Sequence, residues 1–194
     1  MRTALQLLAA QLACAAVIPV GAQSMGDFID AAQPVISWKN VTSYLLGGAS
    51  SQKLAQTLTV EIGGTFVGVW LPIECGTSTV TVEIRDVVAG APGPKVLDTM
   101  LVDPVFFDAG RRLVFVATSN AVSFVAGQQI SIVMRTGGEC VLYASPAGMN
   151  FPVNVPSYPG GQAFFEAAPN PPGWVPLSTF PGQPDDLPFM LLLR

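Results

Sequence analysis

The sequence contains no histidine, few charged residues and only three cysteines. Without histidine there can be no Ser-His-Asp or Cys-His catalysis and no HExxH zinc site. Charged residues make up 11% of the chain, the formal net charge is −4, and the longest basic run is Arg111-Arg112. This balance argues against nucleic acid or an anionic membrane as a partner.

Long apolar runs are also scarce, and the one that stands out lies at the N-terminus. Met1-Arg2-Thr3 is followed by a mostly apolar stretch from Ala4 to Val20 and by the small residues Gly21 and Ala22. This layout predicts a signal peptide at 1–22 and a mature domain at 23–194, secreted or periplasmic. Lipidation at Cys14 is the less favoured alternative, because Gln11 stands where a lipobox has an aliphatic residue. No other apolar run reaches membrane length, so no transmembrane segment is expected.

Cleavage of this leader removes Cys14 and leaves Cys75 and Cys140, which lie 65 residues apart. Two cysteines in an exported chain most simply form a disulfide with each other. A loop of this length gives about 4 kcal/mol of stabilisation in the chain-entropy model. The alternative is a pair of buried free thiols.

Period-two alternation of polar and apolar residues dominates the mature chain and predicts antiparallel strands in a sandwich or barrel. Helical periodicity is confined to one short turn expected at Met25 to Ala32. Turns are expected at Gly63-Gly64, at 90–94, at 108–110 and at 136–138. The expected strands are 57–62, 79–85, 105–107, 113–117, 122–125, 130–135 and 141–144.

Proline is concentrated near the C-terminus, where residues 146–188 hold 11 of the 17 prolines. Proline cannot donate to a sheet ladder, so central strands are not expected there. We interpret 146–174 as a long Pro/Gly-rich loop that contains an edge strand at Gln162 to Glu166. A last strand, Leu187 to Leu193, returns to the core.

Several short stretches of the sequence are similar to those of one known group of proteins. They are Gly47 to Gln56, Thr81 to Arg85 after Cys75, the turn at 90–94, Gly127 to Val133, Tyr158 to Gly161, Pro169 to Leu177 and Asp185 to Phe189. In these stretches the chain resembles bacterial exported proteins related to choice-of-anchor domain proteins. The resemblance implies a single jelly-roll-like β-sandwich with a Cys75–Cys140 disulfide, and it implies no activity.

Aromatic side chains give two candidate ligand-binding sites. In the stretch from Thr65 to Ile73, alternation places Phe66, Gly68 and Trp70 on one face, where exposed rings could stack on a sugar. The alternative is that aromatic neighbours cover the glycine, or that the strand is buried on both faces. Tyr158 and Trp174 in the long loop form the second candidate with Phe164 and Phe165. Its alternative is a satellite cluster that holds the loop against the sandwich.

Acidic residues offer weaker chemistry. A pair of carboxylates could hydrolyse a glycoside, and Glu74 and Glu139 are notable because each precedes a cysteine. Asp185 and Asp186 are candidates for structural calcium, although Asp-Asp is equally a turn dipeptide. The other acids considered are Glu83, expected at a solvated strand position, and Glu166.

The sequence thus predicts a non-catalytic binding or surface-associated module whose partner is a carbohydrate or another cell-surface component. The alternatives are a self-associating structural protein of the envelope and, less favoured, a carboxylate-dependent glycoside hydrolase. No organic cofactor is expected.

Overall fold

A computed structural model describes residues 26–33, 42–103, 113–144, 158–170, 172–180 and 185–194. The expected signal peptide at 1–22 and the expected strand at 105–107 lie outside these residues. So does most of the first half of the expected loop at 146–174.

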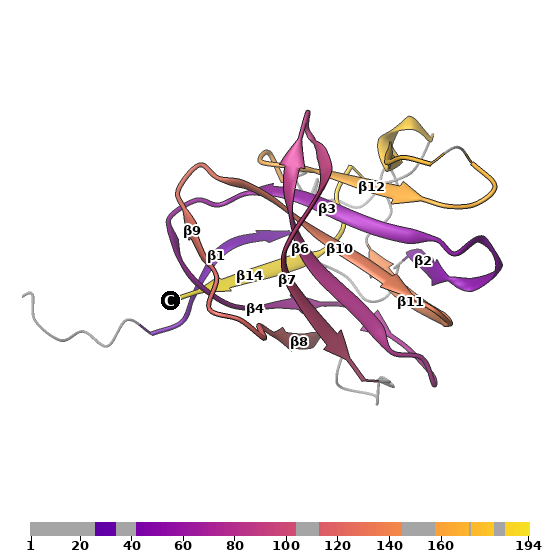
Figure 1. Cartoon of the computed structure of the whole chain (residues 1–194), viewed down its shortest axis with the longest axis horizontal. Coiled ribbons are helices and arrows are strands. Elements are labelled where there is room, and N and C mark those ends of the chain that lie inside the picture. The colour runs from indigo at the N-terminus through magenta and orange to yellow at the C-terminus, as the bar shows by residue number, and fades with distance from the viewer. Residues whose placement is uncertain (1–25, 34–41, 104–112, 145–157, 171, 181–184) are drawn as a thin grey trace, which may run out of the picture.

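The described residues form three antiparallel sheets (Figure 1). Sheet I has six strands in the order β13-β12-β3-β10-β6-β7. Their bounds are β13 Val175–Pro176, β12 Gln162–Glu166, β3 Lys53–Thr59, β10 Gln129–Thr136, β6 Val80–Val88 and β7 Ala91–Val102.

Sheets II and III complete the architecture. Sheet II has the order β1-β14-β4-β8, and β9 pairs with the start of β4. Its strands are β1 Phe28–Gln33, β14 Phe189–Leu193, β4 Gly63–Leu71, β8 Val114–Ala117 and β9 Ser123–Val125. Sheet III has the order β2-β11-β5, with β2 Thr42–Gly47, β11 Glu139–Ala144 and β5 Ile73–Glu74.

One apolar core lies between the sheets. Alternate residues of β3 and β10, such as Leu58 and Ile132, are fully buried in the same cluster as Val69 and Leu191 of sheet II. Period-two patterning therefore builds a layered structure, because each strand gives one face to the core. The expected all-β sandwich is confirmed, whereas its jelly-roll connectivity stays a prediction. Among the described residues the only helical elements are the 3₁₀ turns η1 Gly48–Ser50 and η2 Leu177–Thr179.

The disulfide expected from the sequence joins Cys75 to Cys140. Their Cα atoms are 4.4 Å apart, and both side chains are buried. Cys75 follows β5 and Cys140 lies in β11, which pair as neighbours in sheet III. The bridge therefore closes a loop of 65 residues at a point where the two segments already meet.

Several expectations about elements are wrong. Strand β12, expected at the edge of a sheet, lies between β13 and β3, and Gly63-Gly64, expected as a turn, begins β4. Residues 28–33, expected as part of a helical turn, form strand β1, which pairs with β14. Strand β7, the longest in the structure, covers 91–102, where only a turn at 90–94 was expected. It is an edge strand of sheet I, so Pro92 and Pro94 cost it little hydrogen bonding.

Candidate functional site

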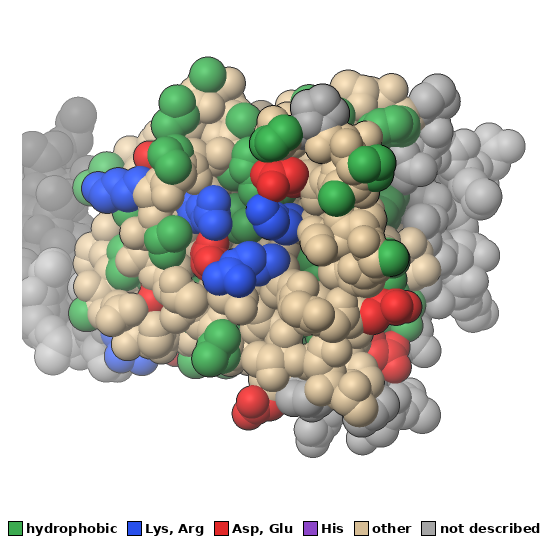
Figure 2. Space-filling view, turned by 45° about the vertical axis from the view of Figure 1, so that its right-hand side comes forward, with side chains coloured by type: hydrophobic (Ala, Val, Ile, Leu, Met, Phe, Trp, Pro, Cys, Tyr) green, Lys and Arg blue, Asp and Glu red, His purple; other side chains and the backbone are tan. Residues whose placement is uncertain are grey.

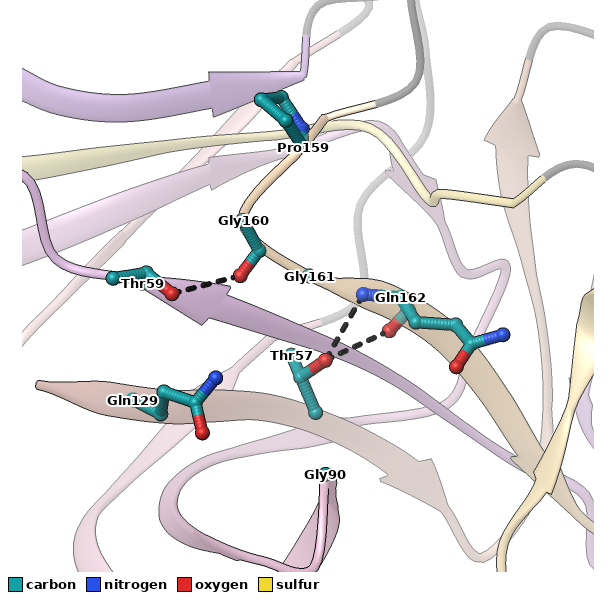
Figure 3. Close-up of a pocket in the computed structure, with 8 residues that line it drawn as sticks. All are labelled: Thr57, Thr59, Gly90, Gln129, Pro159, Gly160, Gly161 and Gln162. Atoms are coloured by element: carbon teal, nitrogen blue, oxygen red, sulfur yellow. Dashed lines mark hydrogen bonds between the residues drawn. The ribbon is translucent and has the colours of Figure 1, made fainter. Parts of the chain in front are cut away.

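A polar groove lies on the outer face of sheet I, the face turned away from the main core. Its volume is about 280 Å³. The floor comes from outward positions of β3 and β10, one wall from the start of β12, and the rim from the tip of the β6–β7 hairpin (Figure 3). The lining residues are Thr57, Thr59, Gly90, Gln129, Pro159, Gly160, Gly161 and Gln162.

Glycines bring the wall close to the floor. A Cβ on Gly161 would lie 1.7 Å from the carbonyl oxygen of Thr57, and one on Gly160 would lie 2.8 Å from the Tyr158 ring. Gly90 has a φ of +82° at the hairpin tip, which suits glycine. The Tyr158-Pro159-Gly160-Gly161 segment can therefore pass over the end of β3 without steric conflict.

Threonine hydroxyls fasten this wall to the floor. Thr59 Oγ1 donates to the carbonyl oxygen of Gly160 over 2.9 Å (Figure 3). Thr57 Oγ1 accepts from the backbone N–H of Gln162 over 3.0 Å and donates to its carbonyl oxygen over 3.2 Å. Both hydroxyls are thus engaged, and the side-chain amides of Gln129 and Gln162 are the larger polar groups that remain for a ligand.

The electrostatic character of the groove is neutral, because none of its eight lining residues is ionisable. Gln129 is exposed, and within the described part of the chain its side-chain amide makes no hydrogen bond. Gln162 Nε2 donates to Ser178 Oγ over 2.8 Å and keeps its carbonyl oxygen for other donors. The groove therefore offers donors and acceptors without fixed charge, which suits hydroxyl-rich ligands.

Asp186 binds the wall segment on the side away from the groove. One carboxylate oxygen accepts from Gln56 Nε2 and the other from the backbone N–H of Tyr158, each over 2.7 Å. Burial, opposed by these two hydrogen bonds, raises the pKa of Asp186 to about 6. Asp185 is exposed, and its backbone carbonyl accepts from Ala163. Of the two calcium candidates, Asp186 thus has both carboxylate oxygens bound by protein donors that are distant in the sequence.

Two of the four aromatic residues expected to contact ligand are buried. Phe66 is 1% exposed and packs against Phe124 with ring centroids 5.8 Å apart. Tyr158 is 7% exposed, donates its hydroxyl to the carbonyl oxygen of Thr59 and meets Phe189 edge-on. Neither ring is exposed in the way that the expected ligand contact requires.

The misplacement of Phe66 has a local cause. The pairing of β14 with β4 changes register between Leu192, opposite Gly68, and Leu193, opposite Phe66. This irregularity interrupts the strict alternation of β4, so Phe66 and Val69 both reach the core. A single-sequence pattern carries no signal for a bulge that depends on the partner strand.

Trp70 lies on the outer face of sheet II beside Phe115, with ring centroids 5.1 Å apart. A Cβ on Gly68 would lie 2.6 Å from the ring of Phe115. This is the cross-strand covering of glycine given above as the alternative to a sugar platform. The pair is partly exposed, with Phe115 at 37%.

Trp174 belongs to a small cluster on the outer face of sheet I. It packs against Ala55, Val133 and Phe164, which are buried there together. The expected alternative, a satellite cluster that holds the loop, thus describes Phe164 and Trp174, whereas Phe165 joins the main core. The cluster lies next to the groove, because Ala55 and Thr57 are successive outward positions of β3.

The acidic candidates are distributed over several sheets. Glu74 accepts a hydrogen bond from the Tyr143 hydroxyl over 2.6 Å, and Glu166 pairs with Lys53 over 2.7 Å. Glu139 is exposed at the start of β11. Glu83 is not solvated as expected, because it is 4% exposed and is bound by Arg85 and Arg135.

The groove was missed by sequence reasoning. Its floor residues are polar residues at outward positions of alternating strands, which look like ordinary solvated positions. The useful signal was Tyr158-Pro159-Gly160-Gly161-Gln162, since two adjacent glycines next to a strand indicate a close backbone approach.

The fold and site together define the class of protein: an all-β, disulfide-bonded, sandwich-like domain with a neutral polar groove on one outer face. The sequence matches no protein-family profile and no curated protein. The resemblance to choice-of-anchor domain proteins stays a prediction. In the part of the chain that the structure describes, every helix is too short to cross a membrane.

Proposed function

We propose that this chain is an exported, non-catalytic module that binds carbohydrate in the groove of sheet I. The observation that carries the proposal is the lining itself, in which amides, hydroxyls and glycine backbone surround a volume of about 280 Å³ without a charged side chain. Sugars present hydroxyls that donate and accept at once, and side-chain amides match them in both capacities.

The surroundings of the groove support this function. Gly160 and Gly161 line the groove with backbone, because the places where their Cβ atoms would lie are filled by the Tyr158 ring and the Thr57 backbone. The wall is fixed by Thr57, Thr59 and Asp186, so little ordering entropy is lost on binding. Trp174 in the adjoining cluster is partly exposed and offers the edge of an aromatic surface beyond the polar part.

Polysaccharide binding by the mature chain tests this proposal. We expect neutral polysaccharides, presented in affinity gels or glycan arrays, to retard the protein. Gln129→Ala and Gln162→Ala should each weaken binding about fivefold to tenfold, because each removes a hydrogen bond worth about 1 kcal/mol. Thr77→Ala, at an exposed position outside the groove, is the matched control and should bind like the parent.

Loss of binding in Thr77→Ala, or unchanged binding in both glutamine variants, would remove the groove from the proposal. Trp70→Ala and Trp174→Ala separate the two aromatic surfaces. A sugar that binds in the groove depends on Trp174 and not on Trp70.

Self-association is a second candidate function, favoured by the outer face of sheet II. Trp70, Phe115 and Ile29 leave apolar surface exposed there. A second copy of the chain would cover it, and light scattering at rising concentration should then show dimers that Phe115→Ser abolishes. A monomer at every concentration would contradict this function.

A further inference from the structure

A charged cluster lies beside the groove on the same outer face of sheet I. Glu83 is 4% exposed, and each of its carboxylate oxygens is bound by a different arginine. Arg85 binds Oε2 through Nε, over 2.7 Å, and through Nη2. Arg135 binds Oε1 through Nε over 3.0 Å and Nη2 over 2.8 Å.

This cluster carries an excess positive charge, because two guanidinium groups share one carboxylate. Burial tends to raise the pKa of Glu83, but hydrogen bonds and charge from Arg85 and Arg135 outweigh it and lower the pKa. Glu83 therefore stays ionised and holds the two arginines side by side. The neighbouring pair of Lys53 and Glu166 is neutral overall.

Each guanidinium keeps donors that Glu83 does not use. A guanidinium has five N–H donors, and the contacts with Glu83 occupy the Nε and Nη2 edge of each. The side chains of Arg85 and Arg135 are 21% and 47% exposed, so solvent reaches both. Figure 2 shows basic side chains gathered around acidic ones near the middle of one face of the molecule. The cluster can therefore accept a further anion.

Strand register relates the cluster to the groove. Arg85 is paired with Ser131, and Ser131 is paired with Thr57 of the groove floor. Two strand spacings thus separate Arg85 from Thr57, about 10 Å in all. This separation corresponds to a short oligosaccharide, so one chain can occupy the groove and reach the arginines.

We infer that the groove and the arginine cluster together select an anionic polysaccharide over a neutral one. The inference rests on the proposed function and adds the charge of the ligand. Hydroxyl groups of the polysaccharide bind Gln129 and Gln162. A carboxylate or sulfate further along the same polysaccharide accepts hydrogen bonds from the free donors of Arg85 and Arg135. The chain as a whole has a net charge of −4, so attraction of a polyanion has to come from this local cluster.

Matched polymers test the inference. The mature protein is run through affinity gels that contain polygalacturonate or its fully methyl-esterified form, and dextran sulfate or dextran. We expect each anionic polymer to retard the protein more than its neutral partner, with the difference shrinking as NaCl is raised. The two pairs distinguish a carboxylate from a sulfate as the preferred anion.

Variants locate the anion. Arg135→Gln should weaken binding of the anionic polymer about tenfold, as expected for a charge-assisted hydrogen bond, and leave binding of the neutral partner unchanged. Arg135→Lys should restore only part of the loss, because lysine lacks the planar fork. Arg194→Gln makes the same change of charge at the end of sheet II, where Arg194 pairs with Asp27, and should have no effect.

Removal of either arginine leaves Glu83 with one partner, so urea unfolding of each variant checks that the fold is kept. Arg135 is the more exposed of the two, at 47% against 21%, and Arg135→Gln is therefore the decisive variant, compared with the charge-preserving Arg135→Lys. Equal retardation by anionic and neutral polymers, with dependence on Gln129, would overturn the inference and leave the proposed function standing. An equal loss in Arg194→Gln and Arg135→Gln would also overturn it. Retardation by none of the four polymers would overturn both.

Discussion

Asp186 is a buried carboxylate whose pKa is about 6 in the folded chain, against an ordinary value of 3.8. Because the folded state prefers the protonated form, its contribution to stability is complete below about pH 4 and declines as the pH rises through 6. The decline amounts to as much as about 3 kcal/mol. Asparagine cannot ionise, so we expect the stability of Asp186→Asn to show no such decline as the pH rises.

The measurement is urea unfolding of both proteins at several pH values between about pH 4 and about pH 7. Asparagine has one acceptor for the two donors from Gln56 and Tyr158, so the variant starts about 1 kcal/mol less stable at the acid end. Glu83 and Asp98 have lowered pKa values, and the stability they add is lost as the pH falls. Both proteins share that loss, so the difference between their curves isolates Asp186. A difference independent of pH would contradict this assignment.

Single residues were also where sequence reasoning was weakest. Glu83 occupies a polar position of an alternating strand, which predicts exposure, yet Arg85 and Arg135 cover it. Arg85 is two residues away on the same strand face, but Arg135 is 52 residues away and reaches Glu83 only through the pairing of β10 with β6. Tyr158 was misplaced for the same reason, since its burial depends on Phe189 and Thr59.

Strand β1 is attached to the rest of the sandwich by one side chain as well as by β14. Asp30 accepts three hydrogen bonds from the turn between β3 and β4: from Glu61 over 2.8 Å, Ile62 over 2.7 Å and Gly63 over 3.1 Å. Asp30→Ala leaves these three backbone donors without the carboxylate. We expect it to lower the free energy of unfolding by about 2 to 4 kcal/mol.

Chemical denaturation measures this loss, and Asp27→Ala is its matched control. Asp27 lies three residues earlier and pairs with Arg194 in a partly exposed salt bridge, so its removal should cost less than about 1 kcal/mol. Equal effects of the two substitutions would mean that Asp30 does not anchor β1.

Strands were predicted well where one face is polar and the other is apolar. Strands β6 and β10 were expected at 79–85 and 130–135 and lie at 80–88 and 129–136. Strand β1 was misassigned because its sequence, Phe-Ile-Asp-Ala-Ala-Gln, lacks clear alternation and forms a strand through its pairing with β14. Strand β7 was missed because prolines suggested a turn, whereas at an edge they replace few ladder bonds.

At the scale of the whole molecule, the fold class and the disulfide could be predicted from the sequence, whereas the groove and the arginine cluster could not. Period-two alternation and the pair Cys75 and Cys140 were enough to predict an all-β sandwich and its disulfide, because these features depend on local pattern and on counting. The groove depends on the pairing of β12 with β3, and the arginine cluster depends on the pairing of β10 with β6. Both are long-range registers, which local patterns do not encode.

The disulfide is the one covalent constraint between distant segments of the described structure. It closes a loop of 65 residues, so its removal restores chain entropy to the unfolded state and costs about 4 kcal/mol in the chain-entropy model. For a domain of this size, that loss lowers Tm by about 8 to 16 °C. Calorimetry of the oxidised protein and of the Cys75→Ala/Cys140→Ala double variant measures this loss of Tm.

Reduced parent protein serves as the control for packing, because both cysteines are buried and alanine leaves some space. The double variant should unfold no higher than the reduced parent, and both well below the oxidised form. Titration of two free thiols in the native, unreduced protein would contradict the constraint, and with it the fixed position of β11 against β5.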